Sequence, residues 1–147
     1  MQSDSVLTTI TDRLAINDLF VRYTRALDAG DVETVVGCFT ADAVLESPVI
    51  GSIAGHEAIR AFADRFAAQR EAGRQFRHMI TNLAVEFAGQ RARATCYLLV
   101  LITRDGNSRQ LPPGHYECDL LKENGEWYFR RRVVFHDHAY TLDEFNQ

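Results

Sequence analysis

The second half of the chain consists of runs of strand-forming residues separated by tight-turn signals, and this pattern restricts the fold most strongly. Four runs follow Gly73, and they span residues 75–88, 91–104, 108–122 and 126–138. The breaks between them are Ala88-Gly89, Asp105-Gly106 and Asn124-Gly125. Asp-Gly and Asn-Gly are typical of two-residue hairpin turns, which join antiparallel neighbours. The sequence therefore predicts an antiparallel sheet in this half of the chain.

The first half of the chain shows helical spacing instead. Between residues 8 and 28 the apolar positions recur at steps of three and four, as Ile16, Phe20, Tyr23 and Leu27. Gly30 supplies a helix stop, and Asp31 can cap a short second helix through Phe39. A short strand is expected at 43–47 and a loop after it, and a third helix begins at Gly55.

Helices followed by a meander of strands are typical of an α+β fold. We expect three N-terminal helices packed on a strongly curved antiparallel sheet, with a pocket enclosed between the sheet and the helices. The 147 residues are enough for a single domain over 1–147 with a core and a small-molecule cavity.

Composition excludes several classes of partner. The net charge of −4 gives no attraction for nucleic acid or anionic lipid, and no apolar run is long enough to span a membrane. Cys38, Cys96 and Cys118 are widely spaced in apolar segments, which indicates buried reduced thiols. The first residues lack the features of an export signal. We therefore expect a cytoplasmic protein.

Asp28 and His78 are the residues best suited to carry chemistry. Asp28 ends the first helix, where its charge meets the negative end of the helix dipole at a cost of a few tenths to about 1 kcal/mol. His78 shares a strand face with Ile80 and Asn82, and buried polar groups need partners. A carboxylate on one ring nitrogen would fix the tautomer and leave the other nitrogen to take a proton. The alternatives are a turn aspartate bonded to nearby backbone and a structural histidine.

Further candidates surround this pair. Tyr23 is a third catalytic candidate, whose hydroxyl would polarise a carbonyl or assist a leaving group; a core aromatic is the equal alternative. Four further residues are expected to bind substrate: Phe20 and Phe62 on the helices, Asn82 beside the histidine and His115 at the rim.

Arg130–Arg132 are expected at an exposed or interface edge. His136 and His138 lack a third ligand, so no metal is predicted. The sequence has no Gly-rich phosphate loop and no Rossmann fingerprint, so no cofactor is predicted.

Several motifs occur in the order of a known family. They are LDAGD, FTADAVLE, GHEAIRAF, RHMITNLAVEF and NGEWYFRRRVV, within residues 7 to 140. In this order they resemble the SnoaL-like branch of the NTF2-like superfamily, and most of all scytalone dehydratase, hexachlorocyclohexane dehydrochlorinase and bile acid 7α-dehydratase. The resemblance implies that the fold is an NTF2-like (cystatin-like) cone. It also implies an Asp–His dyad at Asp28 and His78 and a pocket tyrosine at Tyr23. It places Val100, or a neighbour within CYLLVLI, where the bile acid enzyme has an acidic residue. Val100 is also expected to bind substrate.

Two functions from different classes follow. The first is a cofactor-independent lyase or isomerase that abstracts a proton from a small apolar cyclic substrate, as in dehydratase-like elimination. The second is a noncatalytic ligand-binding or assembly module, such as the β subunit of a ring-hydroxylating dioxygenase. The resemblance also implies a homodimer or homotrimer.

Overall fold

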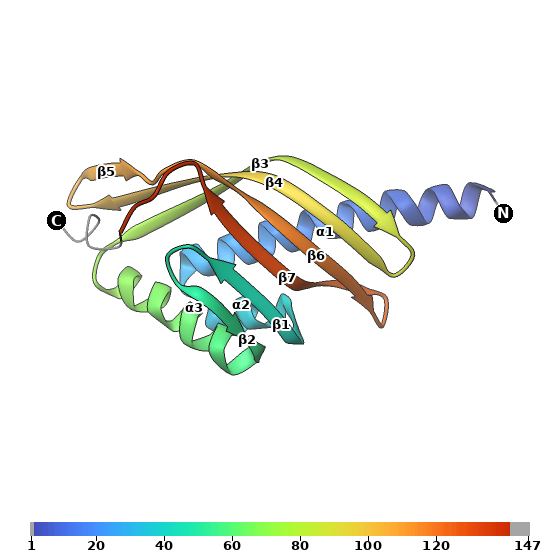
Figure 1. Cartoon of the computed structure of the whole chain (residues 1–147), viewed down its shortest axis with the longest axis horizontal. Coiled ribbons are helices and arrows are strands. Elements are labelled where there is room, and N and C mark those ends of the chain that lie inside the picture. Colours follow the sequence, from blue (N-terminus) through green and yellow to red (C-terminus); the bar gives the residue numbers. More distant parts are fainter. Residues whose placement is uncertain (1, 142–147) are drawn as a thin grey trace.

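The computed structural model describes residues 2–141 as helices packed on a curved, unclosed sheet (Figure 1). The helices are α1 (Gln2–Ala29), α2 (Val32–Gly37) and α3 (Gly55–Glu71). The strands are β1 (Phe39–Ser47), β2 (Gly51–Ala54), β3 (Gln75–Ala88), β4 (Arg91–Arg104), β5 (Asn107–Gln110), β6 (Gly114–Glu123) and β7 (Glu126–His136). The sheet order is β2-β1-β7-β6-β4-β3, with β5 paired to β4. The α+β class with about three helices is confirmed.

The sheet is mixed, so the prediction of an antiparallel sheet was wrong for one pair. β1 runs parallel to β7, with Leu45 opposite Arg132 and Glu46 opposite Val133. All the other strand pairs are antiparallel. Turn signals set the direction of consecutive strands only. β1 and β7 are separated by most of the chain, and no turn between them fixes their relative direction.

The two strongest turn signals form the predicted hairpins. Asp105 and Gly106 have φ values of 51° and 76°, and Asn124 and Gly125 have values of 51° and 82°. Positive φ at both central residues is the requirement of a type I′ turn, which Asn-Gly and Asp-Gly meet at low cost. These turns join β4 to β5 and β6 to β7.

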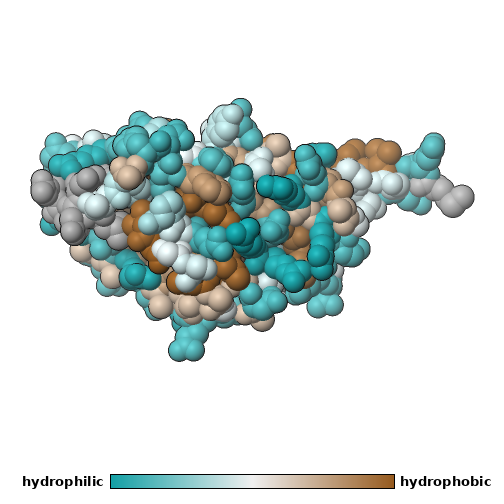
Figure 2. Space-filling model, viewed as in Figure 1, coloured by the Kyte–Doolittle hydropathy of each residue, from teal (hydrophilic) through white to brown (hydrophobic). Residues whose placement is uncertain are grey.

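Other boundaries differ from the predictions. The run expected at 108–122 is divided at residues 111–113, because Pro112 and Pro113 have no backbone N–H for a sheet ladder. β2 replaces an expected loop, and α1 begins well before residue 8. Its N-terminal turns extend past the sheet in Figure 1, and Figure 2 shows hydrophobic surface there, where Val6, Leu7, Ile10 and Leu14 are exposed.

The core lies between α1, α3 and the concave face of the sheet. Cys38, Cys96 and Cys118 are buried and unpaired, as predicted. Within residues 2–141, no helix combines the length and the apolar character needed to cross a membrane.

Gly30 ends α1 and brings α3 against it. Its φ of 74° is left-handed, and Asp31 N donates to Ala26 O at 2.9 Å, as in a Schellman motif. A Cβ at Gly30 would lie 3.3 Å from the Cα of Ala67 in α3. Glycine is therefore required both for the turn and for the close approach. This turn fixes Asp28 in the last turn of α1, next to the sheet.

Asp12 attaches the middle of α1 to the sheet. This buried carboxylate accepts hydrogen bonds from Lys122 Nζ and Trp127 Nε1, both at 2.9 Å. Burial alone would raise the pKa of Asp12, but the hydrogen bonds from Lys122 and Trp127 outweigh it and lower the pKa below its ordinary value of 3.8. The ionised carboxylate thus stabilises the folded state.

We expect Asp12→Ala to lower the free energy of unfolding by about 1–3 kcal/mol, because it leaves a buried indole N–H and an ammonium without their acceptor. Asp18→Ala, at an exposed position of the same helix, should change it by less than about 0.5 kcal/mol. Since the folded pKa is depressed, this stabilisation is present above pH 3.8 and is lost as the pH falls through the lower folded value. Urea unfolding of both variants from pH 7 to pH 3 tests this; equal losses at pH 7 would contradict it.

Candidate active site

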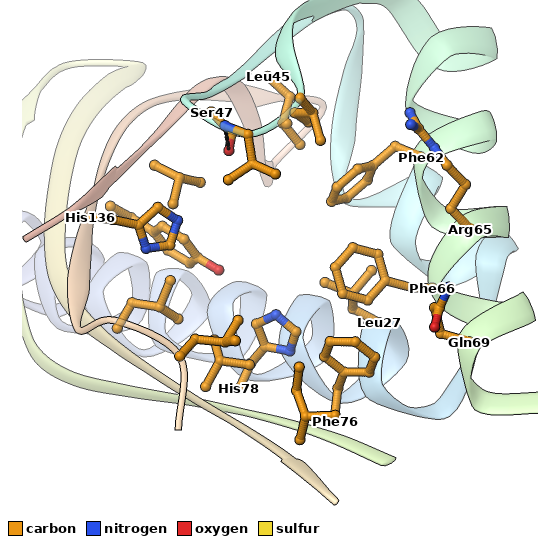
Figure 3. Close-up of a pocket in the computed structure, with 18 of the residues that line it drawn as sticks. Leu27, Leu45, Ser47, Phe62, Arg65, Phe66, Gln69, Phe76, His78 and His136 are labelled. Atoms are coloured by element: carbon orange, nitrogen blue, oxygen red, sulfur yellow. Dashed lines mark hydrogen bonds between the residues drawn. The ribbon is translucent and has the colours of Figure 1, made fainter. Parts of the chain in front are cut away.

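A cavity of about 350 Å³ lies between the C-terminal end of α1, α3 and the sheet (Figure 3). Its volume suits a small ligand. Most of its wall is apolar, from Leu27, Leu45, Val49, Ile50, Phe62, Phe66, Ala68, Phe76, Leu98, Val100, Ile102, Leu111 and Val134. The polar lining residues are Ser47, Arg65, Gln69, Arg74, His78, Tyr116, Arg132, His136 and Tyr140.

His78 and Asp28 are held together by two hydrogen bonds. The backbone N–H of His78 donates to Asp28 Oδ2 at 2.9 Å, and His78 Nδ1 lies 2.5 Å from Asp28 Oδ1. Their side chains are only 6% and 13% exposed. A carboxylate has no proton to give at neutral pH, so Nδ1 carries the hydrogen. The lone pair of the neutral ring is therefore on Nε2.

The ring of His78 is directed into the cavity (Figure 3). It stacks on Phe76 with the ring centroids 6.2 Å apart, and Phe66 of α3 lies 5.7 Å away. Aromatic walls of this kind keep water away from Nε2 and strengthen electrostatic interactions near it. The arrangement can accept a proton from a bound molecule and stabilise the resulting imidazolium through Asp28.

Phe62 and Val100 also line the cavity. Phe20 and Tyr23 do not, although both were expected there. Phe20 is buried against Phe129, with the ring centroids 5.0 Å apart, and Tyr23 packs edge-on against Phe39 and Phe129. Both precede Asp28 by more than a turn of α1, where the helix already lies directly on the sheet.

Burial raises the pKa of Tyr23 to about 12, although the nearby charge of Arg132 opposes the shift. Its hydroxyl makes no hydrogen bond within the described residues, and its ring lies under the Arg132 guanidinium at 4.3 Å. The structure therefore places Tyr23 as a support for an arginine and not at the cavity surface.

Asn82 and His115 lie outside the cavity. A β-bulge between Thr81 and Ala84 interrupts the alternation of β3, and Asn82 occupies it with a φ of 55° and an exposed side chain. Asparagine tolerates this left-handed conformation better than most residues. His115 stacks on Phe135, an exposed residue of the outer sheet face, with the ring centroids 4.7 Å apart.

Arg132 is the main cavity residue that the sequence did not predict. A bulge shifts the β6–β7 register, so that Asp119 faces Arg131 while Leu120 faces Phe129. The extra residue, Arg130, reverses the alternation, and Arg132 therefore points inward and is 2% exposed. The expectation that Arg130–Arg132 form an exposed edge is wrong for Arg132. A bulge leaves no clear signal in one sequence.

The two histidines of the H-x-H pair do not share a site. His136 lines the cavity near Tyr140, whose hydroxyl lies 3.3 Å from His136 Nε2, while His138 is exposed. Burial lowers the pKa of His136, which favours the neutral ring. Within residues 2–141 no group of three or more His, Cys, Asp or Glu residues is arranged to hold a metal ion.

Comparison with known proteins assigns this chain to a family. The model of the SnoaL-like domain matches residues 8–133. The chain belongs to the SnoaL-like family. This family includes scytalone dehydratase-like enzymes.

Solved structures support the family assignment at the level of the fold. A protein of unknown function from Mycobacterium tuberculosis is 26% identical with a TM-score of 0.81, over 97% of this chain and 80% of its own. An NTF2-like protein with a cystatin-like fold from Novosphingobium aromaticivorans is 22% identical with a TM-score of 0.83, over 93% and 89%. A scytalone dehydratase-like protein from the same organism is 17% identical with a TM-score of 0.77, over 92% and 93%. The curated proteins gave no match.

The positive φ of Asn82 and its place outside the cavity predict how substitutions at this residue affect stability and ligand binding. Asn82→Gly should leave the free energy of unfolding nearly unchanged, since glycine accepts positive φ. Asn82→Val should lower it by about 1–2 kcal/mol, because a β-branched residue is strained there. Urea unfolding measures both. Ligand binding in the cavity should be the same in Asn82→Gly as in the wild type; a loss would mean that the amide contacts the ligand.

Proposed function

We propose that this SnoaL-like protein is a cofactor-independent lyase or isomerase that takes a proton from a carbon atom of a small, largely apolar cyclic substrate. The observation that carries the proposal is the double hydrogen bond from Asp28 to His78, on the wall of an otherwise mostly apolar cavity. His78 is the base and touches the substrate. Asp28 holds the base, since both of its oxygens are engaged by His78.

Elimination is the reaction favoured by this pairing. His78 Nε2 accepts the proton, and the electrons of the broken C–H bond form a carbon–carbon double bond as the leaving group departs with its bonding pair. When the leaving group is hydroxide, the imidazolium returns the proton to it, and the products are an alkene and water. The charge of Asp28 stabilises the imidazolium between the two proton transfers.

Isomerisation needs the same first step. If the carbon acid has no leaving group, the imidazolium returns the proton to a different carbon, and the double bond moves. The apolar wall supports both reactions because it excludes water, which would otherwise solvate the base. Phe66 and Phe76 beside the imidazole serve this role.

The proposal is tested with 5-nitrobenzisoxazole, a flat apolar compound whose ring opens when a base removes its C–H proton. The N–O bond breaks in the same step, and a coloured cyanonitrophenolate forms. We expect the wild-type protein to accelerate this reaction. His78→Ala should lose about 10²–10⁴-fold of the enzyme-dependent rate, and Asp28→Asn on the order of 10²-fold, because general base catalysis contributes this much.

The control variant is His115→Ala, which removes a histidine from the outer sheet face and should retain the wild-type rate. Circular dichroism of each variant confirms that the fold is intact. A wild-type rate no higher than that of His78→Ala would contradict the catalytic proposal and favour a noncatalytic ligand-binding module.

A further inference from the structure

Arg132 presents a buried positive charge at the cavity that the elimination mechanism does not use. Its side chain is 2% exposed, and it forms no ion pair with a carboxylate of the described residues. Its Nε and Nη1 atoms are buried and have no hydrogen-bond partner within residues 2–141. Buried charges in proteins are ordinarily paired and hydrogen-bonded. Two buried guanidinium nitrogens of Arg132 without an acceptor among residues 2–141, in a cavity wall, therefore suit an anionic ligand.

The groups around Arg132 do not neutralise it. Its guanidinium lies between the rings of Tyr23 and Tyr116, 4.3 Å and 4.4 Å from the centroids. Burial raises the pKa of both tyrosines, as it does for the nearby thiols of Cys96 and Cys118. All four groups are therefore uncharged at neutral pH. The two rings supply cation–π attraction, which holds the guanidinium in place without cancelling its charge.

The rest of the cavity has the same sign of charge. Arg65 and Arg74 line it as well, and none of its lining residues in the described range is acidic. Arg74 donates through Nη1 to Gln69, while its Nε is buried and has no hydrogen-bond partner in the part of the chain that the structure describes. The chain as a whole has a net charge of −4, so this cationic lining contrasts with the rest of the protein. A cavity with these walls attracts an anionic molecule with an apolar body.

We propose that the cavity binds a compact cyclic carboxylate, whose anionic oxygens lie against the Arg132 guanidinium. Arginine suits this role because its planar fork matches a carboxylate. This inference rests on the proposed function, since it names the substrate class of the same cavity. Tyr23, under the guanidinium, precedes Asp28 by five residues, or roughly 7.5 Å along the helix axis. A molecule of one or two rings has a length of this order, which suits a carboxylate at Arg132 and a reacting carbon near His78.

The test compares 2-naphthoate with its uncharged isostere 2-naphthamide by isothermal titration calorimetry. We expect the wild-type protein to bind naphthoate at least about tenfold more tightly than naphthamide. Arg132→Met should weaken naphthoate binding about 10- to 100-fold, as expected for a lost hydrogen bond between charged groups, and change naphthamide binding less than about threefold. Arg132→Lys should recover part of the naphthoate affinity.

The matched control is Arg130→Met, two residues away on β7 and outside the cavity lining, which should bind naphthoate like the wild type. Circular dichroism confirms that each variant is folded. If Arg132 were only a structural clamp between two tyrosines, Arg132→Met would weaken both ligands equally. If it served only an oxyanion that develops during a reaction, the wild type would bind both ligands equally. Either result, or no saturable naphthoate binding at millimolar concentration, overturns the proposal.

His78→Ala separates this inference from the proposed function. It should retain the preference for naphthoate over naphthamide, because the carboxylate is held at Arg132. A protein that binds naphthoate through Arg132 but shows no His78-dependent elimination retains the ligand class and loses the catalytic proposal. The opposite pattern, elimination with no carboxylate preference, overturns the ligand class alone.

Discussion

The carboxylate of Asp28 joins the end of α1 to the edge strand of the sheet, and the site depends on this contact. One oxygen accepts the backbone N–H of His78 and the other contacts its ring. The helix dipole opposes a negative charge at this position. The two hydrogen bonds offset that cost and make the carboxylate part of the fold. The same contact that positions β3 against α1 therefore also orients the imidazole.

Much of this arrangement could be predicted from the sequence because it is encoded locally. Gly30 requires a left-handed turn, which ends the helix at Ala29 and leaves Asp28 in its last turn. The Asp105-Gly106 and Asn124-Gly125 turns determine their hairpins. The features that could not be predicted are non-local or break the regular alternation. The parallel pairing of β1 with β7 has no turn to signal it. The bulge at Asn82 leaves its side chain exposed. The bulge at Arg130 turns the side chain of Arg132 into the cavity.

The two bulges have opposite consequences for the chemistry of the cavity. Without the bulge in β3, Asn82 would share the face of His78 and place an amide beside the base. With it, the Asn82 side chain is exposed and Leu83 packs against the core instead. The bulge in β7 turns an arginine inward from a stretch that would otherwise be charged surface. One single-residue irregularity thus leaves an amide exposed, and the other brings a cation to the cavity wall.

Tyr23 connects these two features, although its hydroxyl does not reach the cavity. Its ring lies under the Arg132 guanidinium, and its position on α1 is fixed by the same helix that carries Asp28. A buried arginine without a counter-charge is costly, and cation–π contacts recover only part of that cost. A hydrophobic residue at this position would give a more stable core. Because a protein gains little from a buried charge without a carboxylate partner, as Arg132 is among residues 2–141, we interpret the tyrosine pair as a support for an arginine that binds an anionic ligand.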